Sequence, residues 1–121
     1  MRLIVDTGVF GQIVHPRRYE EVRAWLARAV SIHEVLLSEV CDYELRRELL
    51  RIGARRSLDR LDELGRELRY VPVTTATWRS AAGLWAMARR VGRPSADRES
   101  LDADVLLAAQ ARAESGSLSW L

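Results

Sequence analysis

Short apolar runs that alternate with longer amphipathic stretches restrict the fold of this chain more than any other feature. The runs cover residues 2–5, 35–37 and 70–73, and they are rich in Val, Leu and Ile. Runs of this length and composition are typical of buried strands. Strands that are separated by helices predict an α/β fold in which a parallel sheet is flanked by helices.

The stretches between these runs carry apolar side chains at three- and four-residue spacing, which indicates amphipathic helices. Ser38 is a suitable N-cap for one of them, and Gly53 is a suitable C-terminal stop for the same helix. The predicted helices cover residues 19–30, 39–52, 55–69, 76–91 and 101–114.

The length of 121 residues and the hydrophobic content of 48% predict one domain that spans residues 1–121. No run approaches the roughly 18 apolar residues of a membrane span, and Asp6 interrupts the N-terminal apolar run that a signal peptide would need. We therefore expect a cytoplasmic protein with no membrane partner. The single cysteine, Cys41, is expected to be a buried and inert thiol.

All 19 basic residues are arginine. The lack of lysine excludes P-loop nucleotide hydrolases, which need a lysine on the phosphates, and Schiff-base enzymes, which need an amine. Phosphatases of the haloacid-dehalogenase type also begin with a strand and an aspartate. They need a second acid two residues later, where this chain has Gly8, and a lysine as well.

Acidic residues stand at three places where a catalytic group would be useful. Asp6 directly follows the first predicted strand, and ligands of parallel sheets bind at the carboxyl ends of the strands. A helix N-cap is an equally good interpretation of Asp6 on its own. Glu44 lies at the edge of the apolar side of the helix predicted over 39–52, where a solvated glutamate is the plainer interpretation.

The third place is the sequence Leu-Asp-Ala-Asp-Val-Leu-Leu-Ala-Ala-Gln-Ala, residues 101–111, in which two acids open an otherwise apolar helix. Favourable interaction with the helix dipole explains one such acid. Residues two apart lie about 200° apart around a helix, so Asp102 and Asp104 converge only if Asp102 precedes the helix. Asp104 is the stronger candidate for a functional residue.

Taken in order, LIVDTGVFG, the Tyr-Glu-Leu around Glu44 and DVLLAAQA resemble the successive motifs of PIN-domain nucleases, in particular VapC-like toxins. The resemblance implies a PIN-like three-layer α/β fold and a Mg2+- or Mn2+-dependent ribonuclease, the toxin of a type II toxin-antitoxin pair. It implies Asp6, Glu44 and Asp104 as catalytic metal ligands, Asp102 as an additional ligand or supporting acid, and Thr7 as the residue that orients the cluster. RNA is then the substrate, and an antitoxin protein is a partner.

The chain departs from the family pattern at Gly8, where relatives often have Asn or Ser, and after residue 116, where relatives continue into further strands. We therefore expect a domain that is incomplete at its C-terminus, with the C-terminal strands missing. The first strand would then have an uncovered edge, and such an edge favours pairing with a second copy. This predicts a homodimer or an insoluble product.

Arginines gather over residues 46–60 and 89–98, where they could bind phosphates. At a net charge of +2 we interpret them mainly as solvated helix faces paired with nearby acids, with a local basic rim allowed. His15 and His33 lack metal-ligand spacing to each other and receive no catalytic role. The alternative to an active ribonuclease is an inactive PIN remnant that binds RNA or an antitoxin without cleaving RNA.

Overall fold

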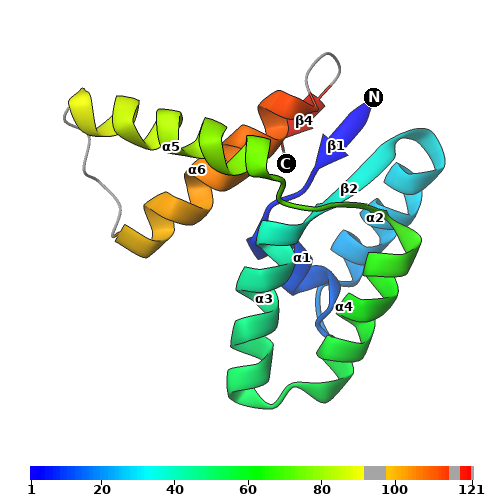
Figure 1. Ribbon diagram of the computed structural model, residues 1–121. Coiled ribbons are helices and arrows are strands. Elements are labelled where there is room, and N and C mark those ends of the chain that lie inside the picture. The colour runs from blue at the N-terminus through cyan, green and yellow to red at the C-terminus, as the bar shows by residue number, and fades with distance from the viewer. Residues whose placement is uncertain (92–97, 115–117, 121) are drawn as a thin grey trace.

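The computed structural model describes residues 1–91, 98–114 and 118–120, and it describes no side chains at 98–102 or 118–120. Four short strands form one parallel sheet in the order β3-β2-β1-β4 (Figure 1). The strands are β1 (Arg2–Ile4), β2 (Glu34–Ser38), β3 (Arg69–Val71) and β4 (Leu118–Trp120). In the register, Leu3 lies beside Val35 on one side and Ser119 on the other. β1 is therefore an interior strand.

Helices connect the strands and flank the sheet. They are α1 (Thr7–Ile13), α2 (Glu20–Ile32), α3 (Glu39–Ile52), α4 (Arg55–Glu67), α5 (Thr75–Arg90) and α6 (Arg98–Ala113). Figure 1 shows α1 to α4 grouped together, with α5 and α6 packed on each other as a pair that projects from the rest of the molecule. No helix in the described ranges is long and apolar enough to cross a membrane.

Local sequence signals explain where α3 begins and ends. The Ser38 hydroxyl accepts a hydrogen bond of 3.0 Å from the backbone N–H of Val40, which caps the N-terminus of the helix. Gly53 ends it in the left-handed conformation at φ 70°, where a side chain would be strained. Both predicted boundaries of this helix are confirmed.

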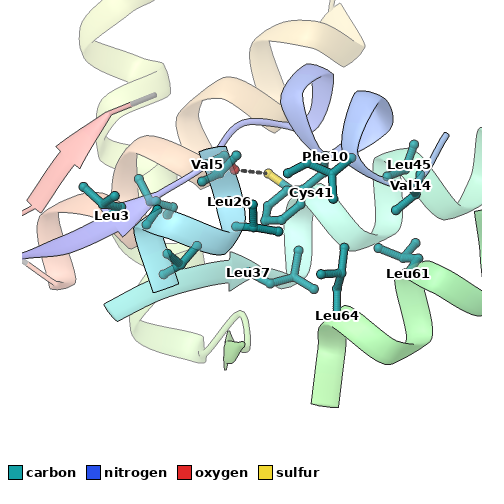
Figure 2. Close-up of a cluster of buried hydrophobic side chains, with 14 of the residues drawn as sticks. Leu3, Val5, Phe10, Val14, Leu26, Leu37, Cys41, Leu45, Leu61 and Leu64 are labelled. Atoms are coloured by element: carbon teal, nitrogen blue, oxygen red, sulfur yellow. Dashed lines mark hydrogen bonds between the residues drawn. The ribbon is translucent and has the colours of Figure 1, made fainter. Parts of the chain in front are cut away.

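The core lies between the sheet and the first four helices. It includes Leu3 and Val5 near β1, Phe10 of α1, Leu26 of α2 and Leu64 of α4 (Figure 2). The apolar stripe on α4 buries Leu64 fully, as its helical spacing predicts. Burying these large side chains places α1 and α3 beside each other at the end of β1.

The PIN-like α/β fold with a parallel sheet and flanking helices is confirmed, but two elements differ from the prediction. Helix α1 forms where only a turn and a possible cap were expected after Asp6. A strand over 118–120 pairs with β1, so the prediction that β1 has an uncovered edge is wrong. Three residues are enough for a strand when they only need to pair with β1. The expected homodimer therefore loses this argument and stays a prediction.

Ion pairs close the amino edge of the sheet and fix the direction of α6. Glu114, just after α6, lies 2.8 Å from Arg2 at the start of β1 and 3.4 Å from Arg69 at the start of β3. Arg69 also contacts Glu34, the first residue of β2, at 2.6 Å. The C-terminal end of α6 is therefore at the amino edge of the sheet, and the helix runs there from the carboxyl edge.

Candidate active site at the carboxyl edge of the sheet

The polar residues of interest lie where the parallel strands end. Asp6 follows β1 after one intervening residue, Ser38 is the last residue of β2, and Val71 is the last residue of β3. Because Ile4 pairs with Leu36 and Ser38 pairs with Val71, these three ends lie at one edge of the sheet. Helices α1 and α3 both start from this edge.

Asp6 and Glu44 are linked through Thr7. The Asp6 side chain is exposed and caps α1 by accepting a hydrogen bond of 3.0 Å at Oδ1 from the N–H of Val9. Thr7, the first residue of α1, donates its hydroxyl hydrogen to Glu44 Oε1 on α3 at 2.8 Å. The cap and the bond across the helices together set the two carboxylates on adjacent elements at the same edge. Both interpretations of Asp6, cap and candidate functional acid, therefore fit its place.

The Cys41 thiol lies between these groups and the core. Its sulfur is fully buried and donates to the carbonyl of Val5 at 3.6 Å (Figure 2). Burial raises the pKa of Cys41 to about 11; the Thr7 hydroxyl opposes this shift, and the negative charges of Glu44 and Asp6 add to it. The expected burial of the Cys41 thiol is confirmed.

A buried glutamine ties α6 to the same edge. Gln110 is 1% exposed; its Oε1 accepts a short hydrogen bond from the Ser38 hydroxyl. Its Nε2 donates to the carbonyl oxygens of Val71 at 3.0 Å and Pro72 at 3.3 Å. One side chain thus joins the ends of β2 and β3 to α6, and its two amide atoms are themselves satisfied in a buried place.

Asp104 is exposed on α6, six residues before Gln110. At a rise of about 1.5 Å per residue it lies roughly 9 Å along the helix from Gln110, in the direction that leads past the carboxyl edge of the sheet. Within the described residues, no contact joins Asp104 to Asp6 or Glu44. Asp102 lies within α6 and not before it, whereas convergence with Asp104 would require a position ahead of the helix. The side chain of Asp102 lies outside the described residues.

The carboxylates at this edge are the kind of ligand that a hard divalent cation prefers, but there are few of them. Among the residues that the structure describes, no group of three or more His, Cys, Asp or Glu side chains is gathered closely enough to hold a metal ion. Mg2+ is commonly held by one or two carboxylates, with water completing its coordination. Asp6 and Glu44 provide oxygen donors of that kind at one edge, so these residues fit such an ion.

Two residues of this edge were not recognised from the sequence. Ser38 was predicted only as a cap, and Gln110 was read only as part of an apolar helix. The available signal was a glutamine in the middle of an apolar run, because a polar side chain in a buried helix needs partners. Gly8 lies next to the site, and a Cβ added there would sit 3.5 Å from Asp6 Oδ1. A Ser or Asn at this position would therefore be next to the Asp6 carboxylate.

Comparisons with known proteins agree with this architecture. The sequence matches the family described as PIN domain over residues 3–118, so the chain belongs to the PIN domain family, a family of nucleases. A comparison with curated proteins gives no match.

Solved structures resemble the whole chain. VapBC2 from Rickettsia felis, bound to a DNA fragment from its promoter, has a TM-score of 0.76 at 15% identity, with 98% of this chain and 85% of that chain covered. FitAB bound to the IR36 DNA fragment has a TM-score of 0.70 at 23% identity, with 96% and 82% covered. FitAcB from Neisseria gonorrhoeae has a TM-score of 0.67 at 23% identity, with 96% and 84% covered. These likenesses support the VapC-like PIN fold.

Proposed function

We propose that this protein is a metal-dependent endoribonuclease that hydrolyses RNA phosphodiester bonds and serves as the toxin of a type II toxin-antitoxin pair. The observation that carries the proposal is the bond from Thr7 to Glu44 beside Asp6, which holds two carboxylates at the ligand-binding edge of a PIN fold. The similarity to VapBC2 and FitAB, which are complexes, supports an antitoxin protein as partner.

Asp6 and Glu44 would hold Mg2+ or Mn2+ in this proposal, and Asp104 would approach from α6. A bound divalent ion neutralises charge on the phosphoryl oxygens and lowers the pKa of water. Thr7 holds the Glu44 carboxylate in one orientation, which lowers the cost of arranging the site for each substrate. The N–H of Val9 donates to the Asp6 carboxylate, so the cap restricts the orientation of this carboxylate.

The alternative is an inactive PIN remnant that binds RNA or an antitoxin. It is favoured by one observation: in the described part of the chain the acids do not form a group of three around a common point. Asp104 is exposed and makes no contact with the other two there.

Cleavage of single-stranded RNA distinguishes these two functions. We expect cleavage that stops in EDTA, returns with Mg2+ or Mn2+, and is lost in Asp6→Asn, Glu44→Gln and Asp104→Asn. Asp59→Asn is the matched control, because Asp59 is an exposed acid on α4 without an ion-pair partner in the described residues. RNA binding without metal-dependent cleavage would establish the inactive alternative. Cleavage that the three site variants retain as fully as Asp59→Asn would remove the site assignment.

A further inference from the structure

A second polar region lies at the other end of α1. Two adjoining hollows, of about 400 and 260 Å3, share His15, Pro16 and Arg56 in their walls. They open between the C-terminal end of α1 and the start of α4. Their other walls include the basic side chains of Arg55, Arg23 and Arg60, and no acidic residue lines either hollow. We call this region the basic hollow.

Two of the four arginines that line the basic hollow are already paired, and the other two are not paired in the described part of the chain. Arg60 lies 3.0 Å from Glu63, and Arg23 donates to the carbonyl oxygen of His15 at 2.9 Å. Arg55 and Arg56 are exposed, and neither has a carboxylate partner within 4.0 Å among the described residues. The interpretation of the arginines as paired helix faces thus holds for Arg60, and it fails for Arg55 and Arg56.

The position of these two arginines is electrostatically unfavourable for the free protein. They occupy the first turn of α4, which has no acidic residue, and Ala54 at the N-cap provides no side-chain hydrogen bond. Cations at the positive end of a helix destabilise it, and unsatisfied N–H groups there add to the positive potential. An anion in the basic hollow would relieve both effects, and guanidinium groups suit phosphate oxygens in particular.

His15 adds a further donor. Its Nδ1 accepts hydrogen bonds from the backbone N–H groups of Arg17 at 3.2 Å and Arg18 at 3.1 Å. The neutral ring must therefore carry its proton on Nε2, which is left to donate. The Ser57 hydroxyl donates to the carbonyl of Val14 at 3.0 Å, and this hydrogen bond links the start of α4 to the end of α1. Hydrogen bonds therefore hold His15 and Ser57, two residues that line the basic hollow, in place.

The basic hollow shares one face of α1 with the acids. Thr7 and Gly11 are four residues apart in α1, so they lie on the same side of the helix. Thr7 contacts Glu44 at one end of this face, and Gly11 lines the hollow at the other end. His15, just after the helix, lines the same hollow. A short single strand could occupy both ends at once.

We infer that the basic hollow binds phosphates of an RNA strand whose scissile bond lies at Asp6 and Glu44. This inference rests on the proposed function and specifies how the substrate is held. Arg55 and Arg56 contact phosphates there, and His15 donates from Nε2. Leu49 and Ile52 also line the hollow and add an apolar surface to its basic wall.

The test is equilibrium binding of end-labelled oligouridylate in EDTA, followed by fluorescence anisotropy at several salt concentrations. EDTA separates binding from cleavage, so a failure here differs from a failure of the ribonuclease assay. The variant is Arg55→Ser with Arg56→Ser. The control is Arg28→Ser with Arg66→Ser, which removes the same charge from exposed arginines on α2 and the end of α4.

Loss of two phosphate contacts should weaken binding about tenfold and reduce the slope of log affinity against log salt by about 1.4. Arg56→Gln alone should show about half of the change in slope, and it guards against a folding defect in the double variant. Equal losses in the variant and the control would overturn the inference. So would polyglutamate binding that depends on Arg55 and Arg56 while oligouridylate binding does not, because the ligand would then be an acidic protein segment.

Discussion

The hydroxyl of Thr7 donates a hydrogen bond of 2.8 Å to Oε1 of Glu44, across 37 positions of sequence. Thr7 begins α1 and Glu44 lies in the middle of α3, so this bond joins the two helices that start at the carboxyl edge of β1 and β2. It links the residue next to Asp6 to the second carboxylate of the candidate site. The orientation of Glu44 therefore depends on the side chain at position 7.

Replacing Thr7 by valine keeps the shape of the side chain and removes the donor. Loss of a residue that orients a metal ligand commonly costs about 10- to 100-fold in activity or metal affinity, and we expect a loss of this size in metal-dependent RNA cleavage by Thr7→Val. Thr7→Ser should retain most of the activity. Thr75→Val, at an exposed threonine on α5, is the control. Full activity in Thr7→Val would show that Glu44 needs no orientation.

Gln110→Met should destabilise the fold, because the buried Ser38 hydroxyl loses the acceptor of its hydrogen and the Val71 carbonyl loses the donor that Gln110 provides. An unsatisfied buried polar group costs about 1–3 kcal/mol, and we expect a decrease of about this size in the free energy of unfolding by urea. Gln12→Met is the matched control, since the Gln12 side chain makes no hydrogen bond within the described residues. Equal stability of the two variants would contradict the role given to Gln110.

The protein should lose stability in alkaline solution through Cys41. Burial raises the pKa of Cys41 from its ordinary value of 9.0 to about 11 in the folded state, so folding favours the neutral thiol. The contribution to stability is complete below pH 9.0 and is lost as the pH rises toward 11. Two pKa units correspond to about 2–3 kcal/mol at most. Burial and the bond to Asp42 also raise the pKa of Tyr70, which acts in the same direction at higher pH.

Urea unfolding below and above pH 9.0 measures this effect when wild type is compared with Cys41→Ala and Tyr70→Phe. Cys41→Ala should lack the decline that begins near pH 9, whereas Tyr70→Phe should keep it. An identical pH profile in wild type and Cys41→Ala would refute the assignment to the buried thiol.

Much of the fold follows from the sequence because its signals are local. Ser38 and Gly53 mark α3 by capping chemistry, and the leucine spacing of α4 gives its buried face. Helix α1 was missed because its seven residues include Gly8 and Gly11, which weaken any helical pattern. Its stability comes from the Asp6 cap and from burial of Phe10, and the second of these is a tertiary effect.

The site was predictable only in part for a related reason. Asp6 could be placed from its position after a strand, whereas the approach of Thr7 to Glu44 depends on how α1 packs on α3. The pairing of β4 with β1 could not be foreseen from three residues that follow Gly116 and Ser117, because register with a distant strand leaves no local pattern. The roles of Asp102 and Asp104 as metal ligands stay predictions.

The most direct measurement of the central claim is anomalous diffraction from crystals of the protein soaked in Mn2+. We predict a peak in the anomalous difference map between the carboxylates of Asp6 and Glu44, and its absence in crystals of Asp6→Asn. A map without density at that edge, or with Mn2+ bound only at other acids, would contradict the account.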